Sequence, residues 1–136
     1  MNRNYSNLKG ELRCLKKSLY ERLGSYDGIA TFADDLLPRL QADPLLERFW
    51  KFQGTDGIAR EKQFLIDFLS FNSGGRMVYT GRNMKTTHGG MNISEEDWTV
   101  FLGHAGATME ALKIPQQECD EMVAFVLGLK DDIVEA

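Results

Sequence analysis

Residues 79–94, YTGRNMKTTHGGMNIS, interrupt a sequence that otherwise shows the spacing of long amphipathic helices. The stretch contains the glycine pair Gly89-Gly90 and has too few apolar residues for a long helix of its own. It carries His88, one of two histidines in the chain. The segment therefore predicts a loop with one very short helix, over 83–89, between two longer helices.

Upstream of this loop, apolar residues recur at helical spacing and are separated by glycine, proline and capping residues. We expect a helix over 12–23 that ends at Gly24, and a second helix over 29–40 that contains Pro38. A short third helix over 45–50 should follow the cap Asp43-Pro44. A break at 54–57 then precedes a long helix over 58–71, which ends at 73–75.

Downstream of the loop, Ser94 is followed by three acidic residues, which is a capping signal for a helix over 95–109. Pro115 predicts the start of a last helix that runs to Ile133. Alternating strand patterns are nearly absent from the whole sequence. The predicted fold class is therefore all-α.

The composition indicates a single folded domain, with 136 residues of which 43% are hydrophobic and 26% charged. A net charge of −4 argues against a nucleic-acid partner. The sequence contains no nucleophile elbow, phosphate-binding loop or HExxH motif. It therefore offers no support for a hydrolase or a nucleotide-dependent enzyme.

Basic residues gather in the first 22 positions, where six Lys and Arg face only two acidic residues. This segment is either the solvated face of an amphipathic helix or a contact surface for acidic lipid or a partner. Cys14 and Cys119 lie far apart and lack CxxC spacing, which favours a reducing cytoplasm. The sequence shows neither a secretion signal nor a transmembrane run.

The two histidines have different surroundings. Met84 and His88 are four residues apart, so they share one face of any helix there, and Met91 follows the glycine pair. This setting suits an axial iron ligand, but it equally suits a hydrogen-bonded packing histidine, and the spacing alone does not decide between them. His104 lies among small residues on a predicted helix, and we interpret it as structural or surface-exposed.

Four stretches follow one another along the chain: YERLGSYDGIATFADDLLPRLQADPLL (20–46), FLIDFLSFNSGG (64–75), YTGRNMKTTHGGMNIS (79–94) and FLGHAGATMEALKIP (101–115). Together they resemble the truncated hemoglobins, and within them most closely the group I, or N-type, lineage. The most specific element is the succession of GG, YTG and MKxxHxG. The match runs from Leu19 to Ile133, which leaves 1–18 as a basic N-terminal helical extension and 19–136 as the truncated globin domain.

This resemblance implies a globin-like, two-over-two helical sandwich around haem b, with His88 as the proximal iron ligand. The second ring nitrogen of His88 would then donate to a backbone or hydroxyl acceptor. The aromatic wall against the porphyrin would come from one of Phe49, Trp50 and Phe52. The resemblance implies these further pocket residues: Phe64, Leu65, Phe68, Tyr79, Met84, Met91, Ile93 and Phe101.

On the distal side the sequence departs from the family pattern. Relatives usually carry a tyrosine where this chain has Leu37, and glutamine is common where it has Glu61 and Leu65. The resemblance therefore implies a largely apolar distal pocket and fast oxygen release, because a buried donor to the bound gas contributes about 1.5–3 kcal/mol. With the register shifted by one residue, Gln63 or Glu61 would reach inward instead.

Phe64 stands where many relatives have a basic residue or a histidine, so a second axial ligand from this position is not expected. The propionates of the haem would then pair with basic residues elsewhere. The candidates are Arg60, Lys62, Arg82 and Lys85, for each of which a solvated helix face is the alternative.

Three functions follow as hypotheses. The first is a haem protein that reversibly binds, and in this sense transports, oxygen, carbon monoxide or nitric oxide. The second is enzymatic conversion of nitric oxide to nitrate, with a reductase as partner, or a redox-sensing or gas-sensing role for the same globin. The third is a haem-free helical interaction or sensor module that uses residues 1–22. We expect a cytoplasmic monomer or weak dimer.

Overall fold

The computed structural model describes residues 17–75, 84 and 88–135, and these residues form helices joined by short turns. The helices are α2 (Leu19–Arg22), α3 (Ser25–Ala42), the 3-10 helix η1 (Glu47–Phe49), α4 (Thr55–Asn72), α6 (Glu95–Ala111), α7 (Gln116–Leu127) and α8 (Lys130–Ile133). No strand occurs among the described residues, and the all-α prediction is confirmed. The basic segment up to residue 16 lies outside the described part of the chain.

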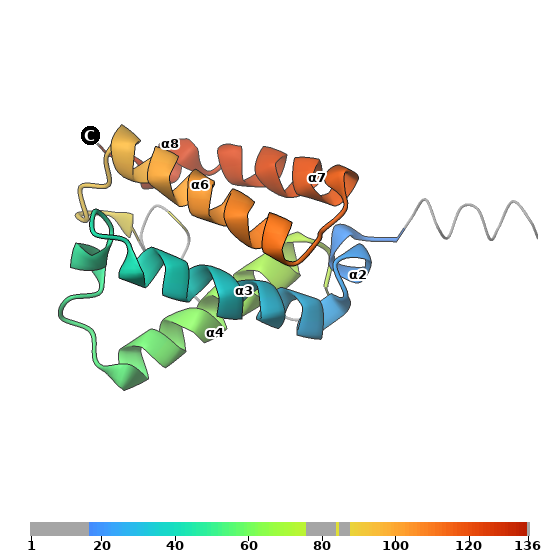
Figure 1. Cartoon of the computed structure of the whole chain (residues 1–136), viewed down its shortest axis with the longest axis horizontal. Coiled ribbons are helices and arrows are strands. Elements are labelled where there is room, and N and C mark those ends of the chain that lie inside the picture. Colours follow the sequence, from blue (N-terminus) through green and yellow to red (C-terminus); the bar gives the residue numbers. More distant parts are fainter. Residues whose placement is uncertain (1–16, 76–83, 85–87, 136) are drawn as a thin grey trace, which may run out of the picture.

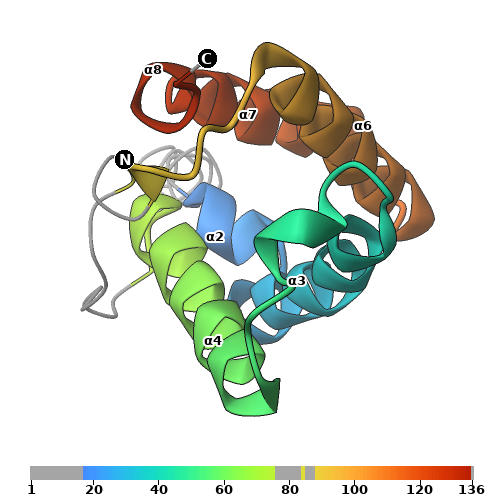
Figure 2. The same cartoon turned by 90° about the vertical axis from the view of Figure 1, so that its left-hand side faces the viewer.

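The four long helices pack as two pairs (Figure 1). Helices α3 and α4 cross each other in one pair, and α6 and α7 lie next to each other in the other pair, as the end-on view in Figure 2 also shows. Helix α3 packs against both α4 and α6 and so joins the pairs. This is the two-over-two sandwich expected from the sequence. No helix in the described ranges is long and apolar enough to cross a membrane.

Helix α3 joins the pairs because its apolar residues face two directions. One stripe, with Ile29 and Ala33, packs with Ile66 of α4. The other belongs to a larger cluster that also draws on α6 and α7, whose buried members are Phe32, Leu36, Leu37, Leu40, Leu46, Ala105, Met109 and Met122. Pro38 lies inside α3 but on its exposed side, where water can satisfy the carbonyl that loses its helical partner.

A forked ion pair holds the start of the described chain against α7. The guanidinium of Arg22 lies 2.7 Å from the buried Glu118 carboxylate and 2.6 Å from that of Glu121. The two carboxylates lie within one turn of α7, so they face the same guanidinium. Helix α2 is also tied to the end of α4, because the Tyr20 N–H donates to the Ser73 carbonyl at 2.8 Å.

The predicted short helix over 45–50 is wrong in type and extent. The segment contains one 3-10 turn, η1, because the Asp43 carboxylate accepts from the Leu45 N–H at 2.8 Å and folds the chain into a tight turn first. The Asp43 carboxylate also meets the His104 ring of α6 at 2.7 Å. His104 is therefore a structural residue that fixes this turn.

Other helix boundaries also differ from the prediction; the helix predicted over 12–23, for example, begins only at Leu19, after the extended cap residue Ser18. Helix α4 begins at Thr55, three residues before the predicted start at residue 58. Gly57, which was expected in the break before the helix, lies inside it. The single helix predicted over 115–133 consists of α7 and the short α8, separated at Gly128-Leu129. The capping box at Ser94 is confirmed, with Asp97 accepting from the Ser94 N–H and Ser94 accepting from the Asp97 N–H.

Gly28, near the start of α3, packs tightly against the turn that precedes the helix, since a Cβ atom there would overlap the Leu23 carbonyl. We expect Gly28→Ala to lower the free energy of unfolding by about 1–3 kcal/mol, because overpacking forces the backbone to shift. Gly103 of α6 is the matched control, because a Cβ there meets nothing within 4 Å. Gly103→Ala should stabilise by about 0.4–1 kcal/mol. Urea titrations check both, and equal effects would contradict the steric argument.

Candidate functional site

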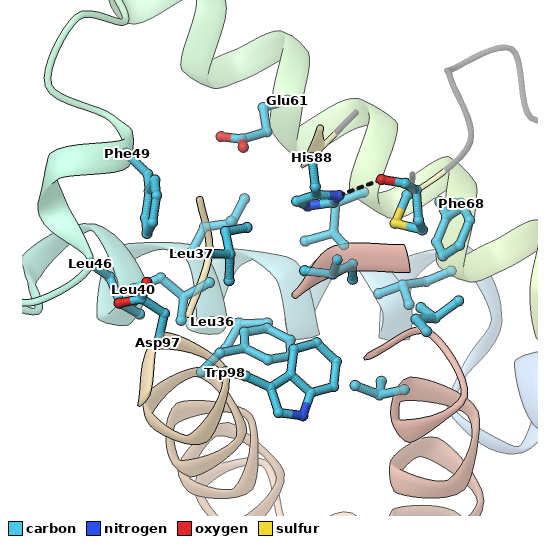
Figure 3. A pocket seen from close by; sticks show the side chains of 18 of the residues that line it. Leu36, Leu37, Leu40, Leu46, Phe49, Glu61, Phe68, His88, Asp97 and Trp98 are labelled. Carbon is cyan, nitrogen blue, oxygen red and sulfur yellow. Dashed lines mark hydrogen bonds between the residues drawn. The ribbon is translucent and has the colours of Figure 1, made fainter. Parts of the chain in front are cut away.

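A cavity of about 250 Å³ lies between the helix pairs. Its wall is built from α3, α4, α6, α7 and α8, together with η1 and the segment around His88 (Figure 3). Almost all lining side chains are apolar or aromatic, and the ionisable ones are Glu61, His88 and Asp97. A large apolar cavity with a few convergent polar groups is the usual form of a cofactor site.

The structure brings most of the expected pocket residues together at this cavity. Those that line it are Leu37, Phe49, Trp50, Glu61, Phe64, Leu65, Phe68, Met84, His88, Met91, Ile93 and Phe101. Tyr79 and Lys85 lie outside the described residues. Five separate regions of the sequence, namely α3, η1, α4, the segment around His88 and α6, thus converge on one space, which local patterns could not show.

Phe52 is the exception, and its expected place against the porphyrin is wrong. It is 92% exposed, in the turn that follows η1, and its ring faces Lys51 at 5.5 Å. Phe49 and Trp50 face the cavity instead and meet edge to face, with ring centroids 6.4 Å apart. The 3-10 turn ends at Phe49, so residues 51–54 leave the helix surface and carry Phe52 away from the cavity.

His88 lines the cavity and is held through one ring nitrogen. The Met84 carbonyl lies 2.9 Å from Nδ1, and a carbonyl only accepts, so Nδ1 carries the proton and donates. In the neutral imidazole this leaves Nε2 with a free lone pair. Figure 3 shows this hydrogen bond as a dashed line. A histidine whose Nδ1–H is held by a carbonyl in this way can ligate a metal through Nε2.

Glu61 of α4 is a carboxyl group in a mostly apolar wall. The Trp50 indole N–H donates to its Oε1. Burial raises the pKa of Glu61 above its usual value, and the Trp50 bond and the charge of His88 only partly oppose this. The part of the cavity wall that α4 contributes therefore contains one acidic group in an otherwise apolar surface.

Asp97 lies at the cavity edge and is 2% exposed. Arg48 and the Ser94 N–H both donate to its Oδ2, and Oδ1 has no hydrogen-bond partner. Burial acts to raise the pKa of Asp97, but the bonds from Arg48 and Ser94 outweigh it and hold the pKa below its usual value. The sequence indicated only a helix cap here, so the place of Asp97 at the cavity was missed.

Other lining residues were also expected only as core, because their apolar spacing gives no sign of a cavity. They include Phe32, Leu36, Leu40, Leu46, Trp98, Met109, Met122, Phe125, Val126, Leu129 and Ile133. Among the basic candidates for propionate pairing, Lys62 instead meets Asp34 at 2.6 Å, Arg60 is exposed, and Arg82 lies outside the described residues.

Comparison with curated proteins finds relatives along most of the chain. A group 1 truncated hemoglobin from Nostoc sp. (strain MUN 8820) is 28% identical over 117 residues, covering 86% of this chain and 97% of the relative. A group 1 truncated hemoglobin from Tetrahymena pyriformis is 25% identical and covers 87% of this chain and 95% of the relative.

Solved structures share the fold. A truncated hemoglobin from Tetrahymena pyriformis in its Fe(III) form matches with a TM-score of 0.79 at 22% identity, over 88% of this chain and 100% of the other. The 2/2 hemoglobin from Synechococcus sp. PCC 7002 matches with a TM-score of 0.79 at 23% identity, over 87% and 98%. The family model for bacterial-like globins matches residues 18–135. The expected resemblance is confirmed, and the chain belongs to the bacterial-like globin family, whose cofactor is haem.

Proposed function

We propose that this chain holds haem b in the cavity between its helix pairs, with His88 as the axial iron ligand, and reversibly binds oxygen, carbon monoxide or nitric oxide. The observation that carries the proposal is the hydrogen bond from His88 Nδ1 to the Met84 carbonyl, on the wall of an apolar cavity. It leaves Nε2 as the only ring nitrogen with a lone pair for a metal.

The residues around the cavity fit this cofactor chemically. Haem, when bound, supplies the iron that coordinates a diatomic gas. Phe49, Phe68 and Trp98 line the cavity and offer flat apolar surfaces, which suit a flat apolar ring. The apolar wall also keeps water from the ring and from the iron ligand, which favours retention of both.

Leu37 and Glu61 carry the proposal for the gas-binding side. Leu37 is 5% exposed and lines the cavity, so it offers bulk but no hydrogen bond to a bound gas. The Glu61 carboxyl is engaged by the Trp50 indole. We therefore propose that gas release is fast unless Glu61 leaves Trp50 and donates its own proton to the gas.

His88→Ala should abolish normal haem ligation. Loss of a residue that only hydrogen-bonds to a metal ligand typically weakens metal binding ~10–100-fold, so we expect loss of the ligand itself to accelerate haem loss by at least that factor. Added imidazole should restore the wild-type spectrum of the ferric, ferrous and carbonyl forms. His104→Ala is the control, since His104 pairs with Asp43 away from His88. A His88→Ala protein with an unchanged spectrum would overturn the proposal.

Leu37→Tyr should slow oxygen release by roughly 10–150-fold, because a hydroxyl donor to the bound gas contributes about 1.5–3 kcal/mol. Leu37→Phe is the matched control, since it adds the same ring without the hydroxyl. Stopped-flow displacement of oxygen by carbon monoxide measures both rates. Equal rates for the two variants would show that no donor reaches the gas from this position.

Glu61 should titrate above the ordinary glutamate value of about 4.3. Infrared spectra should show a protonated carboxyl band that persists above this pH and is absent in Glu61→Gln. Because the native state then binds the extra proton, the contribution of Glu61 to stability falls as pH rises from the ordinary pKa through the raised one.

Trp50→Phe sharpens this test. Loss of the indole donor removes a bond that favours the charged carboxylate, so the infrared band should persist to still higher pH than in the wild type. A band that disappears at the ordinary glutamate pKa in both proteins would contradict the assigned burial.

A further inference from the structure

The carboxylate of Glu135 accepts hydrogen bonds from the backbone of the turn that follows His88. Its Oε2 accepts from the Gly90 N–H at 3.0 Å, and its Oε1 accepts from the Asn92 N–H at 2.8 Å. The Glu135 N–H in turn donates to the Ile93 carbonyl at 2.9 Å. A single residue thus makes three hydrogen bonds to the backbone between His88 and α6.

The backbone of this turn adopts left-handed conformations at both residues whose N–H groups donate to Glu135. Gly90 has φ +84° and Asn92 has φ +56°, which are left-handed conformations that glycine and asparagine tolerate best. The Met91 N–H closes the turn on the His88 carbonyl at 3.2 Å. Bonds from Gly90 and Asn92 hold the pKa of Glu135 below its usual value, so the carboxylate is charged at neutral pH.

Neighbouring contacts join the same two segments. Lys130 of α8 pairs with Glu95 at the start of α6 at 2.7 Å. Leu129, the residue before α8, and Ile133 of α8 line the cavity together with Met91 and Ile93 from the segment after His88. Figure 1 shows the C-terminal end beside the segment that leads into α6. The C-terminal segment and the His88 turn therefore form one wall of the cavity.

We propose that Glu135 is a positioning residue for His88, which it holds in place by fixing the backbone turn that follows it. The proposal rests on the proposed role of His88 as iron ligand. The Met84 carbonyl orients the ring of His88, and the Glu135 carboxylate restrains its backbone on the C-terminal side. With both restraints, Nε2 keeps one direction into the cavity. Without Glu135 the turn can move, and the iron–histidine bond weakens.

Glu135→Gln in the haem-loaded protein is the test. The amide removes the charge and replaces one acceptor oxygen with an NH2 group, which opposes a backbone N–H. Asp132→Asn is the control, because it removes the same charge from an exposed residue of α8. We measure haem transfer to an excess of an apoglobin acceptor, and the iron–histidine stretching frequency of the ferrous form by resonance Raman spectroscopy.

We expect Glu135→Gln to lose haem roughly three- to tenfold faster and to lower the stretching frequency, while Asp132→Asn matches the wild type. Glu135→Asp, whose shorter side chain cannot reach both N–H groups, should behave like Glu135→Gln and replaces it if that variant does not load haem. Unchanged haem loss and frequency in these variants overturn the proposal. So does a change in thermal unfolding alone, or an equal change in Asp132→Asn.

A separate measurement distinguishes failure of this inference from failure of the proposed function. Amide hydrogen exchange at Gly90 and Asn92 in the carbonyl form reports directly on their hydrogen bonds to Glu135, and it should accelerate in Glu135→Gln. If exchange accelerates but the frequency and haem loss do not change, Glu135 holds the turn without positioning His88. If His88→Ala leaves the wild-type spectrum unchanged, the assignment of the iron ligand is wrong instead.

Discussion

The packing of α3 against two partners at once is the constraint on which the rest of the structure depends. Its Ile29 and Ala33 stripe fixes α4, and its Phe32 and Leu36 stripe belongs to the cluster shared with α6 and α7. A buried polar contact reinforces the second side, since the Thr108 hydroxyl of α6 donates to Asp35 at 2.7 Å. Because one helix sets the position of both partners, the space between the pairs is defined by its two faces.

That space acquires its chemistry from very few polar atoms. Glu61, which is half-buried, and Asp97, which is buried, both line the cavity, but their environments push their pKa values in opposite directions. Burial prevails at Glu61, whose donor is a neutral indole, whereas the Arg48 guanidinium and a backbone N–H keep Asp97 charged. Two carboxyl groups at one cavity, Glu61 from α4 and Asp97 from α6, can thus serve different ends, the first as a potential proton donor and the second as an anchor for η1.

The sequence was sufficient for the helical class and the cap at Ser94, because apolar periodicity and capping are local properties, whereas the expected pocket residues came from the resemblance to the truncated hemoglobins. It was insufficient where a distant partner decides the local structure. The Asp43-Pro44 pair is a helix cap by pattern, but the Asp43 side chain folds a turn and is held by His104, 61 residues away. Phe49 and Phe52 are both phenylalanines in the same short stretch of sequence, but Phe49 is half-buried and lines the cavity, whereas Phe52, beyond the end of the 3-10 turn, is exposed.

The order in which the cavity walls are synthesised follows from their places in the chain. Helices α3 and α4 leave the ribosome early, but Phe125, Leu129 and Ile133, which complete the cavity, come last. The ion pair between Arg22 and Glu121 likewise cannot form until Glu121 is synthesised, 99 residues after Arg22. At about 5–20 residues per second of translation, the early pair spends several seconds with its apolar faces uncovered. The cofactor cavity is therefore incomplete on the ribosome until residues 125–133 have been synthesised, well after α3 and α4.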